Sequence, residues 1–142
     1  MRVRIRVIVE DAAGVVQMQD DIARIERCQL GPGSIGLSLA EAKALLAAAQ
    51  RTIVSAQAEQ HAVAARPCAC CGQPRARKGS GSIVMRTLFG AVRLPSPRYY
   101  RCRCESRGRS SVSSVAAALP QRSTAELVYL QSKWASLICP MD

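Results

Sequence analysis

Two short cysteine motifs, separated by thirty residues, constrain the fold of this chain more than any other feature. Cys68-x-x-Cys71 is followed by Gly72, and the second motif is Cys102-x-Cys104. Structural zinc takes four soft ligands in a tetrahedron, and two cysteine turns brought together by a hairpin supply them. The sequence therefore predicts a small zinc ribbon in which all four cysteines bind one structural zinc ion.

Other interpretations of these thiols stay open. A thioredoxin-like redox pair belongs at a helix start within a βαβ unit, and no such pattern surrounds the first motif. The cysteines can also pack without metal as small hydrophobic residues, or belong to a site that has decayed. Cys70 lies inside the first motif and offers a thiol that can replace a neighbour. We expect Cys28 and Cys139 to be buried, and His61 to be exposed or to cap a helix end.

The residues before the cysteines predict a strand followed by helices. Residues 2–9 alternate arginine with valine and isoleucine, which is typical of a half-buried strand with a cationic wet face. The segment 11–29 has weak helical spacing. A long helix is predicted over 38–64, because Ser38 and Glu41 form a capping box before an alanine- and leucine-rich stripe. Such a helix can pack on its own domain or pair with another helix.

The residues after the first motif predict a small antiparallel ribbon and a last helix. We expect short strands at 83–88, 91–94 and 98–103, with Pro95 and Pro97 interrupting regular pairing between the second and third. A polar connector follows, and the last helix begins at Ser123 or Thr124, with Ser123 and Glu126 as a second capping box. The predicted fold class is α+β, with an N-terminal region at 1–65, a zinc-ribbon-like module at 66–110, and a connector with the C-terminal helix at 111–142.

The positive charge of the chain is concentrated around the predicted ribbon. The formal net charge is +10, and residues 66–109 hold eleven basic residues against one acid, Glu105. A basic stripe of this density is the footprint of a phosphate-binding surface, although an arginine-rich composition can also reflect a GC-rich genome. Tyr99 and Tyr100 either stack on bases or fill the small core. The candidate DNA contacts are Arg75, Arg77, Lys78, Arg98, Arg101 and Arg103.

Four blocks of the chain resemble the amino-terminal part of ISKra-type insertion-sequence transposases. They are "RVRIRVIVE", "GLSLAEAKALLAAAQ", "CACCGQPRARKGSGSIVMRTLFGAVRLPSPRYYRCRC" and "ALPQRSTAELVYLQSKWASL", successive blocks that span the chain from Arg2 to Leu137. The resemblance implies a bacterial DNA transposase whose front part binds transposon ends. It also implies a later RNase H-like part, in which three acidic residues position divalent metal for strand transfer.

We expect the chain to stop before that catalytic part. After residue 60 its only acids are Glu105, Glu126 and Asp142, and two-metal phosphoryl transfer needs several carboxylates that converge on the metals. No catalytic residue is therefore predicted. The first hypothesis is a zinc-stabilised module that binds double-stranded DNA. The others are an interaction module that pairs with itself or with full-length transposase through the long helix, and a non-functional remnant.

The sequence also predicts where the protein resides. No secretory signal or long apolar segment is present, because the first ten residues interleave arginine with aliphatic residues. We therefore expect a bacterial cytoplasmic protein, associated with the nucleoid and with no membrane contact. In a reducing compartment, seven cysteines are more often thiols or metal ligands than disulfides.

Overall fold

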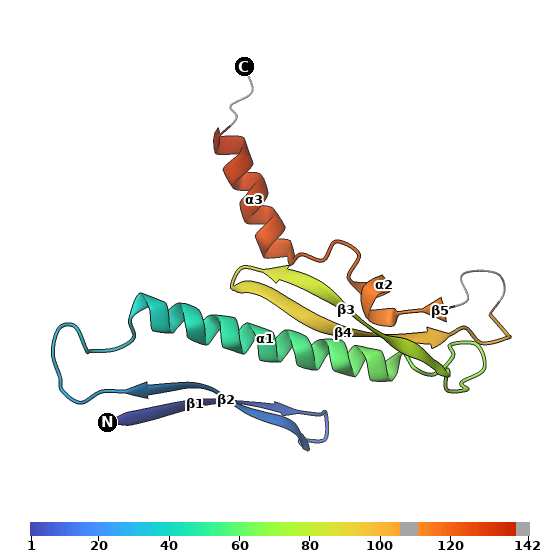
Figure 1. Ribbon diagram of the computed structural model, residues 1–142, viewed down its shortest axis with the longest axis horizontal. Helices are drawn as coiled ribbons and strands as arrows, with labels where there is room; N and C mark the ends of the chain where they lie inside the picture. Colours follow the sequence, from blue (N-terminus) through green and yellow to red (C-terminus); the bar gives the residue numbers. More distant parts are fainter. Residues whose placement is uncertain (106–110, 139–142) are drawn as a thin grey trace. The chain divides into compact units, whose positions relative to one another are not determined.

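A computed structural model of the chain describes residues 1–105 and 111–138 and has an α+β fold (Figure 1). This confirms the predicted fold class, with two small antiparallel sheets, one long helix and a C-terminal helix. The chain divides into two compact units, Met1–Ala56 and Gln57–Asp142, and the boundary lies within the long helix. Within the described ranges, no helix combines the length and apolar character needed to cross a membrane.

The first unit contains a β-hairpin of β1 (Arg2–Glu10) and β2 (Val16–Glu26). The prediction of a weak helix over 11–29 is wrong. Ile22 is an extra residue between the pairs Arg6–Asp21 and Ile5–Ala23, and this bulge shifts the alternation of the strand. Half-buried Met18, Ile22 and Ile25 consequently stand four and three residues apart, a spacing that resembles a helix face.

The predicted strand at residues 2–9 is confirmed, and its arginines are paired with acids of the neighbouring strand. Arg2 Nε lies 2.7 Å from Glu26 Oε1, and Arg6 Nε lies 2.5 Å from Asp21 Oδ1. Arg4 Nε is 3.8 Å from the other oxygen of Asp21. The cationic face of β1 is thus largely neutralised within the hairpin.

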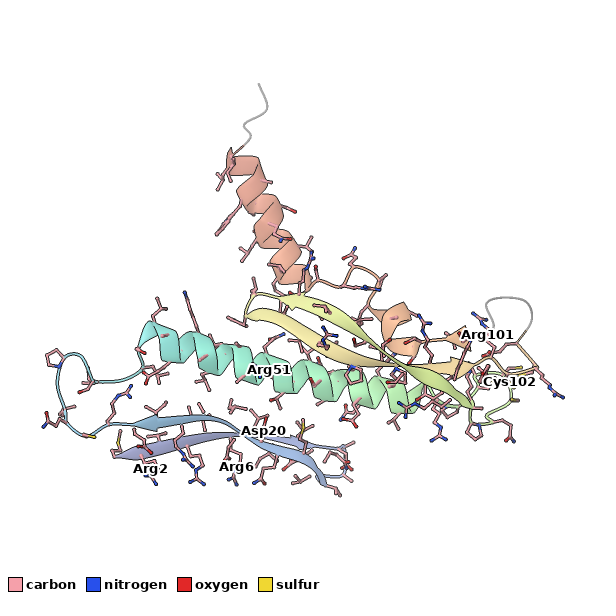
Figure 2. The ribbon with its side chains drawn as sticks, viewed as in Figure 1. Arg2, Arg6, Asp20, Arg51, Arg101 and Cys102 are labelled. Atoms are coloured by element: carbon pink, nitrogen blue, oxygen red, sulfur yellow. The ribbon has the colours of Figure 1, made fainter. Side chains whose placement is uncertain are left out.

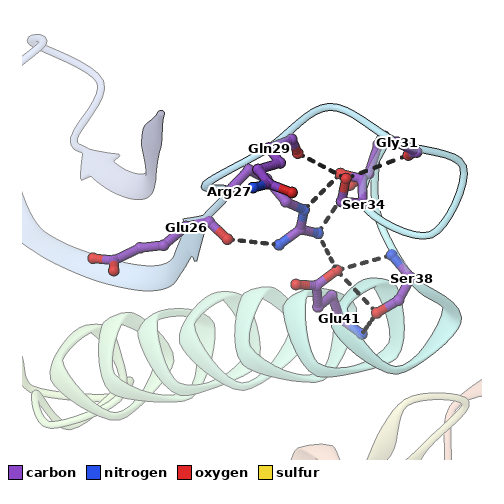
Figure 3. A network of polar contacts seen from close by, with 8 residues as sticks. Glu26, Arg27, Gln29, Gly31, Ser34, Ser38 and Glu41 are labelled. Atoms are coloured by element: carbon purple, nitrogen blue, oxygen red, sulfur yellow. Dashed lines mark hydrogen bonds and ion pairs between the residues drawn. The ribbon is translucent and has the colours of Figure 1, made fainter.

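A polar network connects the hairpin to helix α1 (Leu39–Ala64) (Figure 3). The guanidinium of Arg27 donates to the carbonyl oxygens of Ser34 and Gly36 and to Glu41 Oε2. The predicted capping box is present in both directions, because Ser38 N donates to Glu41 Oε2 and Glu41 N donates to Ser38 Oγ. These contacts lower the pKa of Glu41 to about 2, with the hydrogen bond from Arg27 as the largest cause. The predicted long helix is confirmed.

The second unit is built on a sheet with strand order β3-β4-β5, formed by β3 (Arg77–Thr87), β4 (Gly90–Tyr100) and the short β5 (Ser111–Val112). Strands β3 and β4 are antiparallel and are joined by a two-residue loop, Leu88 and Phe89. The described core of this unit is small, and its buried aliphatic side chains include Ile83, Met85, Val92, Leu94 and Val115.

Contrary to expectation, β4 continues through both prolines. Thr87 and Gly90 flank the loop and form a hydrogen-bonded pair, and the ladder alternates from there. Pro95 and Pro97 consequently occupy positions whose nitrogens point away from β3. Because β5 pairs only with Tyr99 and Tyr100, no strand needs a donor at the prolines, and β4 behaves there as an edge strand.

Two helices follow the sheet. The predicted connector contains α2 (Ser114–Ala118), capped by Ser113, which was not expected. Helix α3 (Ala125–Ile138) begins where predicted, but its cap is Thr124 alone, because Thr124 Oγ1 accepts from Leu127 N. The proposed capping box of Ser123 and Glu126 is therefore wrong. No residue of α3 is buried, and its large apolar side chains other than half-buried Leu127 are exposed, Trp134 included.

Candidate metal centre

The first cysteine motif forms a tight turn directly after the end of α1. Gly72 N donates to Cys68 O at 2.8 Å, and Cys68 N donates to Gln73 O at 2.9 Å, so the chain reverses around the motif. Gly72 has a φ of +71°, a conformation that side chains with a Cβ rarely adopt. The glycine therefore lets the chain turn away after Cys71, as the motif predicts.

The second motif is brought to the first by the β3–β4 hairpin. Tyr100 N, at the end of β4, donates to Ala76 O, just before β3, at 2.9 Å. The next residues turn again, because Glu105 N donates to Cys102 O at 3.1 Å. The two cysteine turns thus lie at the same end of the sheet, which is the arrangement expected for a ribbon.

The four sulfur atoms are close enough to share one metal ion. All lie within 4.8 Å of one another, and three separations are 3.4 Å (Cys68–Cys104), 3.5 Å (Cys71–Cys102) and 3.5 Å (Cys71–Cys104). Tetrahedral Zn–S bonds of about 2.3 Å require sulfur atoms about 3.8 Å apart, whereas a disulfide requires about 2.05 Å. The cluster has the spacing of a four-thiolate metal site, and its described cysteines are all free thiols.

Backbone amides and neighbouring thiols set the ionisation of the cluster. The amide of Cys71, and then that of Cys70, point at the Cys68 sulfur and lower its pKa. The amide of Cys104 and adjacent thiols lower the pKa of Cys102 to about 7. Hydrogen bonding with Cys102 and Cys68 raises the pKa of Cys104 instead. Part of the cluster is thus ready to give thiolates, the form in which cysteine binds metal.

An ion pair lies directly behind the sulfur atoms. The Arg75 guanidinium contacts Glu105 Oε1 and also donates to Ala65 O at 2.9 Å. The other oxygen of Glu105 accepts from Cys102 N at 3.2 Å, and Oε1 lies 3.7 Å from Cys68 Sγ. With side chains only 13% and 18% exposed, Arg75 and Glu105 join both cysteine turns to the end of α1.

The other described cysteines and the histidine are not among the four residues of the cluster. Cys70 is exposed. Cys28 is exposed as well, so the expectation of a buried residue is wrong, and its place at the end of the hairpin explains why. Cys139 lies outside the described residues. His61 is exposed on the last turn of α1, one of the two positions expected for it.

The basic residues predicted to contact DNA have different surroundings. Arg75 is held in the ion pair with Glu105, so its guanidinium is not presented to solvent. Lys78 Nζ lies 5.5 Å from the Tyr100 ring centroid, while Tyr99 is half-buried. Figure 2 shows Arg101 near Cys102, beyond the end of β4. The candidate contacts with exposed side chains are Arg77, Lys78, Arg98, Arg101 and Arg103.

Sequence reasoning missed the role of Glu105. The signal was present, because Glu105 is the sole acid among eleven basic residues in the segment 66–109 and follows the last cysteine directly. An isolated carboxylate in such a segment is a candidate for a buried ion pair. When the chain was compared with family models, curated proteins and solved structures, none of them matched.

Proposed function

We propose that this chain is a zinc-stabilised DNA-binding module that corresponds to the amino-terminal part of an ISKra-type transposase and recognises transposon ends in double-stranded DNA. The observation that carries the proposal is the four-thiol cluster beneath a hairpin that has basic side chains and no acid. Residues 77–100 contain Arg77, Lys78, Arg86, Arg93 and Arg98 but no aspartate or glutamate. Such a surface attracts phosphates without competition from its own carboxylates.

Zinc is the metal that suits this site best. The ligand set is four cysteine sulfurs with tetrahedral spacing, and structural zinc sites of the ribbon type use this set. The described core of the unit is small, so a metal cross-link would add stability that the core alone supplies sparingly. Zinc has no redox chemistry, and four thiolates leave no open position for a reactive water. We therefore assign the metal a structural role and assign no catalytic step to the chain.

The test of the metal assignment is zinc analysis of the purified full chain. We expect about one zinc per chain, and cobalt substitution should give the intense visible absorption of a tetrahedral thiolate site. Cys68→Ser and Cys102→Ser should lose the metal, whereas the matched control Cys70→Ser should keep it. A wild-type protein that folds without metal would contradict the assignment, and loss of metal in Cys70→Ser would move the ligand set to Cys70.

The test of DNA binding is fluorescence anisotropy with duplexes that carry the element ends and with scrambled duplexes. Binding should weaken steeply with salt, with a log-log slope of about −0.9 for each phosphate contacted. Tighter binding to the end sequence would support recognition of transposon ends. Equal affinity for both duplexes would leave a non-specific DNA-binding module, and absence of binding by zinc-loaded protein at low salt would refute the proposal.

A second candidate function is protein interaction through α3. Val128, Tyr129, Leu130, Trp134 and Leu137 are 39–80% exposed, which is unusual for an amphipathic helix of a monomer. In this proposal the helix pairs with a second copy or with full-length transposase. Sedimentation of the full chain, alone and mixed with that transposase, distinguishes the two functions. A strictly monomeric chain in both samples would exclude the interaction role.

A further inference from the structure

A cavity of about 670 Å³ lies at the cysteine end of the sheet in the second unit. Its walls come from three segments: the end of β4, the short β5 and helix α2. The lining includes two guanidinium groups, two hydroxyls and two small apolar side chains, from Arg98, Arg101, Ser111, Ser113, Ala116 and Ala117.

The sheet carries few large side chains where β4 approaches this cavity. Side chains on the core face of β4 run from buried Val92 and Leu94 to Ser96 and then, two residues on, to Arg98. The residues of β3 opposite Ser96 and Arg98 are Gly81 and Gly79. Neither glycine contributes a side chain, and a Cβ on Gly79 would meet no atom within 4 Å.

Helix α2 covers the apolar part of the core face, and its residues Ala116 and Ala117 also border the cavity. Ser96 Oγ and Ser113 Oγ are 2.6 Å apart, which anchors the start of α2 over the middle of β4. Val115 on α2 is fully buried against the sheet. Arg98 is exposed and lines the cavity together with these residues of α2.

The charges around the cavity favour an anionic ligand. No carboxylate is among its described lining residues, and Glu105, the nearest acid in sequence, is already paired with Arg75. Lys78 Nζ lies 3.5 Å from Ser111 Oγ, which places a third cation beside the lining. Guanidinium groups bind phosphate with paired hydrogen bonds, and a hydroxyl can add another.

The volume indicates more than a bare phosphate. Ligand pockets measure about 300–1,000 Å³, and this cavity lies within that range. Ala116 and Ala117 give it an apolar wall against which a sugar or base can lie. We propose that the cavity binds one nucleotide, with its phosphate between Arg98 and Arg101 and its sugar and base against α2. The inference rests on the proposed DNA-binding function when that nucleotide belongs to a DNA strand, while a free nucleotide offers the same chemistry.

The experiment blocks the cavity without changing its charge. Ala117→Trp places a large side chain in the cavity, and the matched control Ala118→Trp alters an exposed residue of the same helix that does not line it. Arg98→Gln and Arg101→Gln remove the cations, with Arg51→Gln as the control, because Arg51 is an exposed residue of α1 that belongs neither to the cavity lining nor to the basic hairpin. Each zinc-loaded variant is titrated with a 20-base-pair duplex and with thymidine monophosphate.

We expect Ala117→Trp to weaken duplex binding at least about tenfold, and Arg98→Gln and Arg101→Gln each to reduce the salt slope by about 0.9. The two control variants should bind like the wild type. Duplex binding that is unchanged in Ala117→Trp would overturn the inference and leave the DNA-binding proposal standing. If the wild type binds thymidine monophosphate but not the duplex, and Ala117→Trp abolishes that binding, the cavity remains a nucleotide site and the DNA-binding proposal is refuted. If the wild type binds neither the duplex nor thymidine monophosphate, both proposals are refuted.

Discussion

The two hairpins of this protein have similar arginine contents but present their charge differently. In β1–β2, Arg2, Arg4 and Arg6 form ion pairs with Glu26 and Asp21 of the neighbouring strand, so the hairpin neutralises much of its own positive charge. In β3–β4 no acid stands between residues 77 and 100, and exposed arginines have no carboxylate across the strand. An arginine-rich strand therefore indicates a phosphate-binding surface only when its paired strand lacks acids.

The hairpins also differ in how they are cross-linked. The first is joined to α1 by hydrogen bonds of Arg27 and Glu41, whereas the second has four thiols at its open end. Hydrogen bonds to charged groups contribute about 1.5–3 kcal/mol, whereas structural zinc contributes about 10–16 kcal/mol of apparent binding free energy in small zinc modules. The second hairpin should thus depend on its cross-link far more than the first.

The largest expected effect is therefore metal removal. Chelation, or the double variant Cys68→Ser/Cys104→Ser, should unfold β3 and β4 and abolish duplex binding. The backbone amides of β1–β2 should stay protected from hydrogen exchange. Amide hydrogen exchange with mass spectrometry reads both hairpins in one experiment. Equal loss of protection in both would show that the units fold as one cooperative body, and protection retained in both would show that the thiols do not stabilise the sheet.

The next effect concerns the ion pair behind the sulfurs. Arg75→Met should lower metal affinity about 10–100-fold, because outer contacts that orient metal ligands typically have this effect. The change leaves Glu105 without its cation beside the cysteine turns. Competition with a chromophoric chelator measures the affinity. Arg77→Met, two residues further on and exposed, is the matched control and should retain wild-type affinity; a similar loss in that control would mean that Arg75 acts only through general charge.

Removing charge from the proposed DNA-binding surface should have a smaller effect, which is on the salt dependence of DNA binding. The double variant Arg77→Gln/Arg103→Gln should reduce the salt slope by about 1.8, corresponding to two lost phosphate contacts. The comparison is Arg2→Gln/Arg6→Gln, which removes the same charge from the neutralised hairpin and should leave the slope unchanged. Anisotropy titrations at several salt concentrations measure both. Equal changes in the two variants would mean that net charge alone governs binding and that the hairpins do not differ.

Local sequence signals predicted the parts of the fold that depend on neighbouring residues. The long helix followed from its stripe and from Ser38 and Glu41, and the face-to-face cysteine turns followed from their spacing and Gly72. The failures involve long-range partners. The bulge at Ile22 changed the apparent period of β2, and Pro95 and Pro97 were compatible with β4 because β5 is too short to reach them. The cavity depends on β5 and α2 lying beside the end of β4, an arrangement that only the fold reveals.

The smallest expected effect tests the polar cross-link of the first unit. Ser38→Ala removes one arm of the capping box and should cost about 1 kcal/mol of stability at the start of α1. Faster hydrogen exchange from Ala42 onward would register this loss, with no change in zinc content. Unchanged exchange would mean that the Arg27 contacts alone hold the helix start.

The same cross-link should weaken in acid. The pKa of Glu41 is lowered to about 2, so its contribution is complete above the unfolded value of about 4.3 and is lost as pH falls towards 2. Because Arg27 is the largest cause, Arg27→Gln should raise the Glu41 midpoint towards its ordinary value, as measured by carbon NMR of the side-chain carboxyl. Ser34→Ala is the control, since it removes a hydroxyl of the same loop but leaves the carbonyl that Arg27 contacts. A midpoint that stayed near 2 in Arg27→Gln would assign the effect to the Ser38 contacts, and the first hairpin would then be joined to α1 by weaker interactions than its geometry indicates.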